Sequence, residues 1–259
     1  MRIAAIIEYD GSRFSGWQLQ VDQSTVQQCV EQALSKVADE PIRVIVAGRT
    51  DAGVHALGQV IHFDTNAVRS SHSWVRGANS HLPREVALLW AGEVDPSLHA
   101  RFTATGRHYR YVILNRPIRP TYLAARVTHE HRPLDIERMR EAAAHLIGTH
   151  DFTSLRSIQC EAPSPVRELR ALTVERNGEF VYLHAYANAF LHHMVRNLAG
   201  VLIAIGASER EPDWARTVLA ARDRRQGGVT AAPDGLYLSE VEYPPTFNIP
   251  RLSSTRFLW

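Results

Sequence analysis

The sequence of 259 residues has little cysteine, almost no lysine and no excess of charge. Its two cysteines, Cys29 and Cys160, form neither a CxxC pair nor a Cys/His pattern, so we expect no zinc site and no disulfide framework. The net charge is only +2, so no global charge indicates a nucleic-acid partner. Lys36 is the only lysine, and the arginines that supply the other basic side chains suit bidentate phosphate contacts and stacking on bases.

The sequence also lacks an early hydrophobic run long enough to enter a membrane. The N-terminal stretch MRIAAIIEYDG is too short, and reaches a charge too soon, for a signal peptide or a membrane span. The apolar content of 45% lets the chain bury a sizeable core in one large domain or two small ones. We therefore expect a protein of the reducing cytoplasm without a membrane partner.

Residues 1–104 follow the order strand, helix, strand, strand, helix, strand. Strands are predicted at 3–9, on both sides of a glycine-bounded turn after Pro41, and at 86–94. A helix with Ser24 and Gln27 in capping-box spacing begins at Ser24, and a second covers 73–82. The loop before the first helix holds Arg13 and Phe14, a basic and aromatic pair that makes both residues candidate RNA contacts.

Residues 105–243 repeat this order with one extra helix. The predicted elements are strands at 105–115, 168–176, 179–187 and 236–243, and helices at 135–147, 191–205 and 213–222. Asn177-Gly178 is a signal for a type I′ hairpin between the two middle strands. Residues 116–133 and 148–165 are predicted connections, and 244–259 form an irregular tail to which we assign no function.

Each half matches the split βαβ, or ferredoxin-like, unit. The predicted fold class is therefore α+β, with two ferredoxin-like or RNA-recognition-like βαββαβ units joined into one extended antiparallel sheet with a central catalytic cleft. RNA-recognition modules use the same unit, so the pattern is compatible with an RNA partner without requiring one.

The run VIVAGRTDAGVHALGQVIHFD places Asp51 in a turn bounded by Gly48 and Gly53. An aspartate in such a turn is often only a turn former that bonds its own backbone. The alternative is a functional carboxylate, because Asp51 lies two residues from the guanidinium of Arg49. Spacing alone leaves both interpretations open.

Further positions carry groups that could act on a nucleic acid or hold a metal. Tyr109 lies in mid-strand with Arg107 and Arg110 close on either side, a pattern that suits stacking on a base while its phosphate is neutralised. Arg196 is placed early on a helix, where a solvated arginine is the simpler interpretation. The adjacent His192 and His193 point to different faces, so a metal pair is not expected.

Five segments in this order, AGRTDAGVHALGQVIHF, GRHYRY, DFTSL, ANAFLHHMVRN and APDGLYL, resemble the TruA-type tRNA pseudouridine synthases. The resemblance covers nearly the whole chain, from residue 3 to about residue 243. It implies the pseudouridine synthase fold and an isomerase that converts uridine to pseudouridine at positions 38, 39 and 40 of the tRNA anticodon stem-loop. It also implies a homodimer that uses no cofactor and no metal.

The resemblance assigns roles to single residues. It implies that Asp51 is the essential carboxylate, Tyr109 stacks on the target uracil, Arg49 displaces the base, Arg196 pairs with the carboxylate and Leu236 forms the floor of the pocket.

Outside these positions the sequence supplies only candidates. Arg107 and Arg156 join the loop residues named above as candidate RNA contacts. His108 stands where members of that family often carry Arg or Lys. Because His108 points to the opposite face from Tyr109, this difference has little effect on the role that the resemblance implies for Tyr109.

The chemistry leaves alternatives open. A carboxylate beside C1′ could be a nucleophile, a base at C2′ or electrostatic support for positive charge at C1′. Two other classes remain as alternatives, a non-catalytic RNA-binding module and an N-glycosidase that releases the base to water. The sequence identifies neither the preferred tRNAs nor the residues of a dimer interface.

Overall fold

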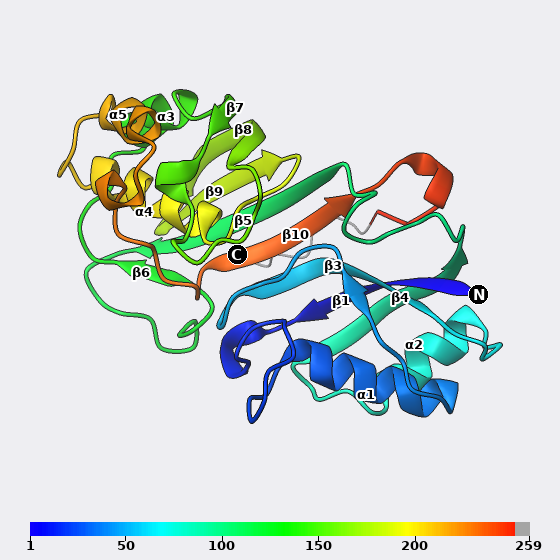
Figure 1. The fold of residues 1–259 in the computed structure, drawn as a ribbon. Helices are drawn as coiled ribbons and strands as arrows, with labels where there is room; N and C mark the ends of the chain where they lie inside the picture. The colour runs from blue at the N-terminus through cyan, green and yellow to red at the C-terminus, as the bar shows by residue number, and fades with distance from the viewer. Residues whose placement is uncertain (252–259) are drawn as a thin grey trace. The chain divides into compact units, whose positions relative to one another are not determined.

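The computed structural model describes residues 1–251, which form ten β-strands, five α-helices and four 3-10 helices (Figure 1). This confirms the α+β class. The chain divides into two compact units, the first made of Met1–Thr105 with Tyr237 onward, and the second of Gly106–Leu236. The last strand therefore belongs almost entirely to the first unit, whereas its sequence order had placed it in the second. Within the described residues, no helix is both long and apolar enough to cross a membrane.

The first unit is a mostly antiparallel sheet with two helices on one face (Figure 1). Its elements are β1 (Arg2–Tyr9), α1 (Val26–Ala38), β2 (Ile45–Val46), β3 (His55–Asp64), α2 (Ser71–Asn79), β4 (Val86–Val94) and β10 (Leu236–Glu242). Strand β1 lies between β3 and β4 and is antiparallel to both, and β2 is antiparallel to β3. Strand β10 adds to β3 in parallel, with Tyr237 opposite His55. The βαββαβ order predicted for the first half is present.

Helix α1 begins one residue later than the predicted capping box. Thr25 is the N-cap, and its hydroxyl accepts a hydrogen bond from the N–H of Gln28 at 3.4 Å. Thr25 and Gln28 have the same spacing as Ser24 and Gln27, so the local sequence supports both starts equally. Burial decides between them, because Thr25 is fully buried and Ser24 is exposed.

The face of the first sheet opposite the helices is covered by the end of the described chain. Ala4, Val94 and Leu98 form a small core there, and the partly buried Phe247 and Ile249 pack against it. Part of the predicted irregular tail is thus packed, and it includes the 3-10 helix Pro245–Phe247. Residues 252–259 of that tail lie outside the described residues.

The second unit is built on a sheet with the strand order β5-β9-β8-β7, in which neighbours are antiparallel. Its elements are β5 (Gly106–Asn115), β6 (Thr128–Glu130), α3 (Ile136–Ala144), β7 (Gly148–Asp151), β8 (Val166–Asn177), β9 (Phe180–Ala187), α4 (Met194–Gly206) and α5 (Trp214–Ala221). Strands β6 and β7 lie in segments predicted as connections, and β6 pairs in parallel with β5.

The hairpin between β8 and β9 is where the sequence predicts it, but its turn differs. Asn177 pairs with Phe180, so the loop consists of Gly178 and Glu179. Of these two residues only Gly178 has a positive φ, at 57°. This is the pattern of a type II′ turn, in which the first central residue is glycine, and the type I′ prediction is wrong.

Candidate active site

Residues 47–54, which we call the Asp51 turn, connect β2 to β3 in the first unit. Gly53 has φ of 80°, and the N–H of Val54 donates to the Asp51 carbonyl at 3.1 Å, which closes the turn. The side chain of Asp51 is half-buried and that of Arg49 is exposed. The turn therefore presents a partly desolvated carboxylate next to an accessible guanidinium.

A buried hydrogen-bond network holds the backbone of the Asp51 turn. The hydroxyl of Thr50, the residue between Arg49 and Asp51, lies 2.8 Å from the phenol oxygen of Tyr9 on β1. The amide of Gln59 on β3 donates to the Gly48 carbonyl at 2.6 Å and to the Tyr9 phenol at 3.4 Å. Burial raises the pKa of Tyr9 to about 12, so its phenol stays protonated. Two strands thus fix the turn.

The loop that precedes α1 packs on the other side of the Asp51 turn. The N–H of Trp17 donates to the Thr50 carbonyl at 3.0 Å. Gly16 has φ of 88°, and a Cβ at this position would lie 2.8 Å from the Thr50 carbonyl oxygen. Only glycine fits here, since a side chain would clash with the turn in a backbone conformation that L-residues rarely adopt.

The aromatic residues of this loop have a structural role. Phe14 is 7% exposed and Trp17 is 1% exposed. Phe14 is therefore a residue of the core, which does not favour its predicted contact with RNA, and that contact stays a prediction. Arg13 is exposed, and it forms an ion pair with Glu85 at 3.0 Å.

The first residue of β3 anchors the far end of the Asp51 turn. His55 is 2% exposed, and its Nδ1 accepts a hydrogen bond from the N–H of Gly11 at 3.0 Å. Its ring stacks on Tyr237 of β10, with centroids 4.6 Å apart and planes 19° apart. The turn is therefore bounded by residues from both ends of the chain.

In the second unit, Tyr109 projects from β5 and is half-buried. The ring of Phe190 meets it edge to face, with centroids 5.0 Å apart. The neighbouring Arg107 is 8% exposed, and its guanidinium donates to the Asn188 carbonyl at 2.8 Å. Arg107 thus ties the segment that carries Phe190 to β5, and its predicted contact with RNA stays a prediction.

Arg196 is the third residue of α4, which confirms its predicted place early on a helix. It is half-buried, and its Nε donates to the Ala231 carbonyl at 2.8 Å, while the Arg196 carbonyl accepts from the N–H of Ala231 at 3.1 Å. The phenol of Tyr111 on β5 donates to the next carbonyl, that of Ala232, at 2.8 Å. Arg196 is therefore not a simple solvated side chain.

The segment that contacts Arg196 is fixed by a buried amide. Asn197 is fully buried, and its Oδ1 accepts from the hydroxyl of Thr230 at 2.7 Å and from Arg224 at 3.0 Å. Its Nδ2 donates to the Leu155 carbonyl at 2.8 Å. Sequence reasoning missed this residue, although it closes the HHMVRN run.

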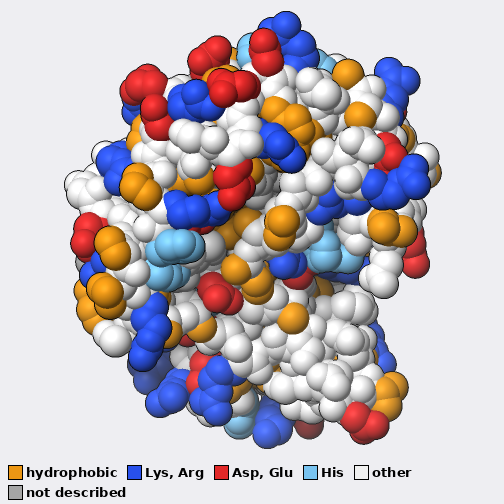
Figure 2. All heavy atoms as spheres, turned by 90° about the vertical axis from the view of Figure 1, so that its left-hand side faces the viewer, with side chains coloured by type: hydrophobic (Ala, Val, Ile, Leu, Met, Phe, Trp, Pro, Cys, Tyr) orange, Lys and Arg blue, Asp and Glu red, His pale blue; other side chains and the backbone are white. Residues whose placement is uncertain are grey.

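The remaining predicted residues are placed as follows. Leu236 is 5% exposed at the start of β10, and Arg156 is half-buried just after the 3-10 helix Thr153–Leu155. The structure therefore groups Arg49 and Asp51 in the first unit, and it places Tyr109 and Arg196 in the second. Arginines lie among acidic, histidine and hydrophobic side chains on the face drawn in Figure 2, as the small net charge predicts.

Sequence comparisons identify the family. A profile of the family described as "tRNA pseudouridine synthase" matches residues 5–103 and 142–244. The chain is 57% identical over 259 residues to tRNA pseudouridine synthase A of Nitrosococcus oceani, with 100% of both chains covered. It is also 57% identical to the proteins of that name from Methylococcus capsulatus, covering 97% of this chain and 93% of the relative, and from Pseudomonas aeruginosa, covering 96% and 88%. The chain belongs to the tRNA pseudouridine synthase family, whose members are isomerases.

Proposed function

We propose that this protein isomerises uridine to pseudouridine at positions 38, 39 and 40 of the tRNA anticodon stem-loop, with Asp51 as the essential carboxylate. The family supports the reaction, and the resemblance of the five segments supports the positions. The main structural support for the role of Asp51 is the geometry of its turn. The carboxylate is half-buried, and the backbone that holds it is fixed by Tyr9, Gln59 and Gly16.

The reaction needs such a fixed carboxylate. The N1–C1′ bond breaks, the uracil turns, and a C5–C1′ bond forms; C5 loses a proton and N1 gains one, so the product is an isomer. Asp51 can act on C1′ as a nucleophile, on C2′ as a base, or by stabilising positive charge at C1′. In all three roles a pre-organised carboxylate lowers the barrier, because the site does not reorganise during the reaction.

The other residues have proposed roles that follow from the resemblance. Tyr109 stacks on the uracil, and its edge-to-face partner Phe190 keeps the ring in one orientation. Arg49 is exposed, which suits displacement of a base from its stem, a step that costs on the order of a few kcal/mol. Arg196 supplies positive charge to the carboxylate, and Leu236 forms the floor of the pocket.

Substitution of Tyr109 separates stacking from proton transfer. Tyr109→Leu removes the ring, and we expect it to weaken tRNA binding by about 1–3 kcal/mol. Tyr109→Phe keeps the ring and should bind nearly as well as the wild type. Filter binding measures both affinities, and single-turnover rates show whether the hydroxyl also moves a proton. Full binding and full activity in both variants would remove Tyr109 from the site.

We also propose that the protein acts in the cytoplasm as a homodimer, without a cofactor or a metal. These properties are implied by the resemblance of the sequence. Sedimentation equilibrium measures the mass of the particle in solution, and assay after dialysis against a chelator tests the metal. A monomer, or loss of activity that is restored by a metal ion, would contradict the corresponding statement.

The function is tested by mapping pseudouridine in tRNA from a strain that lacks this protein. We expect positions 38, 39 and 40 to remain uridine, and the wild-type protein to restore the modification. The purified protein should form pseudouridine without releasing free uracil. Release of uracil would indicate the N-glycosidase, and tight binding without any product would indicate the RNA-binding module.

A further inference from the structure

We propose that Phe102, with Arg101 and His99, forms a second tRNA contact, a stacking platform for one exposed nucleobase away from the reacting uridine. The proposal takes its ligand, tRNA, from the proposed function. The three residues lie in the first unit, in the segment 95–105 that follows β4. We call His99, Arg101 and Phe102 the Phe102 platform.

The Phe102 platform has an exposed aromatic ring with a built support. The side chain of Phe102 is 74% exposed. The His99 ring stacks on it, with centroids 4.2 Å apart and planes 23° apart, and the guanidinium of Arg101 lies 5.6 Å from its centroid. An aromatic face next to an arginine is the combination with which proteins hold an unpaired base and its phosphate.

Hydrogen bonds hold His99 and the backbone around Phe102 rigid. The Nδ1 of His99 accepts from the N–H of Arg101 and of Phe102, both at 3.2 Å. The hydroxyl of Thr103 donates to the His99 carbonyl at 2.8 Å. Phe102 is therefore carried on a segment with its own hydrogen bonds, and its ring is exposed.

The platform rests on the buried interior of the first unit. The His62 ring on β3 lies 5.0 Å from the His99 ring, and its Nδ1 accepts from the N–H of Ala100 at 3.1 Å. Burial lowers the pKa of His62 to about 4, so the ring stays neutral and keeps this bond at physiological pH. The phenol of Tyr243 donates to the Ala100 carbonyl at 2.6 Å.

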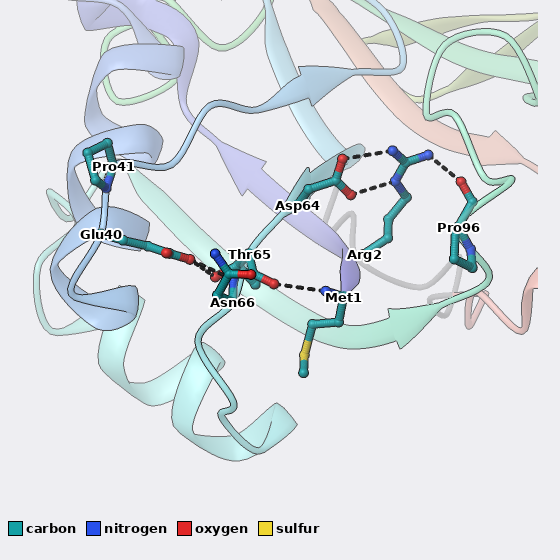
Figure 3. A pocket seen from close by; sticks show the side chains of 8 residues that line it. All are labelled: Met1, Arg2, Glu40, Pro41, Asp64, Thr65, Asn66 and Pro96. Atoms are coloured by element: carbon teal, nitrogen blue, oxygen red, sulfur yellow. Dashed lines mark hydrogen bonds and ion pairs between the residues drawn. The ribbon is translucent and has the colours of Figure 1, made fainter.

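Arg2 fixes the start of the same segment (Figure 3). Its Nη1 donates to the Pro96 carbonyl at 2.5 Å and to the Leu98 carbonyl at 2.8 Å. Its Nε and Nη2 donate to the two carboxylate oxygens of Asp64, both at 2.8 Å.

A groove of about 500 Å³ lies beside Arg2 and is a weaker candidate for a binding site. The charged groups that line it already bond to one another and to the backbone of the groove.

The position of the platform explains why its base is not the target uridine. His62 supports the platform, and His55 ends the Asp51 turn; both lie on β3, seven residues apart. At about 3.3 Å per residue this separation is about 23 Å. The platform is thus supported at one end of β3, and the Asp51 turn joins the other end, so we place a nucleotide other than the reacting one on Phe102.

Binding assays test the platform directly. Phe102→Ala should weaken the affinity for whole tRNA about 5-fold or more, while Phe102→Trp should retain it, because stacking needs only an aromatic face. The matched control is Val68→Ala, another exposed apolar side chain of the first unit, at 75% exposure. These assays measure affinity and not turnover. A negative result therefore contradicts the Phe102 platform alone, whereas the proposed reaction is tested separately by mapping pseudouridine.

Three further readouts sharpen the test. Phe102→Ala should leave the single-turnover rate at saturating tRNA unchanged, since the reacting atoms are elsewhere. It should also leave the salt dependence of binding unchanged, whereas Arg101→Met should reduce it. An isolated anticodon stem-loop shows where the base lies: an effect of Phe102→Ala there places the base within the stem-loop, and an effect on whole tRNA alone places it outside.

Two results overturn the proposal. The first is a tRNA affinity for Phe102→Ala equal to that of Val68→Ala. The second is a change in oligomeric state in Phe102→Ala with unchanged tRNA affinity per subunit, which would show that Phe102 contacts a second copy of the chain instead of RNA.

Discussion

Asp51→Asn is expected to form no detectable pseudouridine and to bind tRNA within a few-fold of the wild type. The amide has nearly the shape of the carboxylate, so the turn and its hydrogen bonds to Tyr9 and Gln59 remain. It has no charge and little nucleophilicity or basicity, so none of the three roles open to Asp51 is preserved. Single-turnover assay with excess enzyme measures the loss, and a binding isotherm shows that the RNA site is intact.

The matched control is Asp22→Asn. Asp22 is an exposed aspartate of the same unit with φ of 58°, a conformation that asparagine adopts readily. This variant loses the same charge and should retain full activity. Substantial turnover by purified Asp51→Asn would contradict the catalytic assignment, and equal losses in both variants would indicate a general effect of charge.

Gly16→Ala is expected to cost both stability and turnover. The new methyl group would lie 2.8 Å from the Thr50 carbonyl oxygen and 3.1 Å from the Ala52 nitrogen, so the Asp51 turn must move. Displacement of a catalytic group by a fraction of an ångström to an ångström lowers the rate by about 10- to 100-fold. The positive φ adds about 1–2 kcal/mol of backbone strain. Urea unfolding and kcat at saturating tRNA measure the two losses.

Gly178→Ala separates strain from displacement. Gly178 has φ of 57°, and a Cβ there meets no atom within 4 Å, so alanine at this position carries the strain without a clash. It should lose about 1–2 kcal/mol of stability and no activity. An unchanged kcat in Gly16→Ala would show that the loop before α1, which carries Gly16, does not position Asp51.

The sequence predicts well those elements whose pattern is local. Strand β4 has its predicted bounds, and α3 begins after Asp135, whose carboxylate caps the helix. Strands β6 and β7 were missed because their three and four residues are too short for a pattern of alternation, and pairing with β5 and β8 is what makes them strands.

For the site, the sequence predicts the turn but not its supports. Asp51 and Arg49 lie in the predicted turn, since glycines mark it in the sequence. Tyr9 and Trp17 bond to Thr50 from more than 30 positions away, and a single sequence has no signal for such pairs. For Phe14 the sequence predicts an RNA contact from an aromatic residue in a loop, and it carries no signal that tertiary packing buries the ring.

The parallel pairing of β10 with β3 sets the order in which the protein can become active during its synthesis. Strand β2 pairs with β3 only at Ile61 and His62, far from the Asp51 turn. The β3 residues next to the turn gain a partner on this edge only when Tyr237 and Leu238 of β10 have been made. At about 5–20 residues per second, the ribosome needs on the order of ten seconds to make the second unit first. During that time the nascent chain has an unpaired strand edge beside Asp51. Another strand can pair with this edge incorrectly until β10 leaves the ribosome and occupies it.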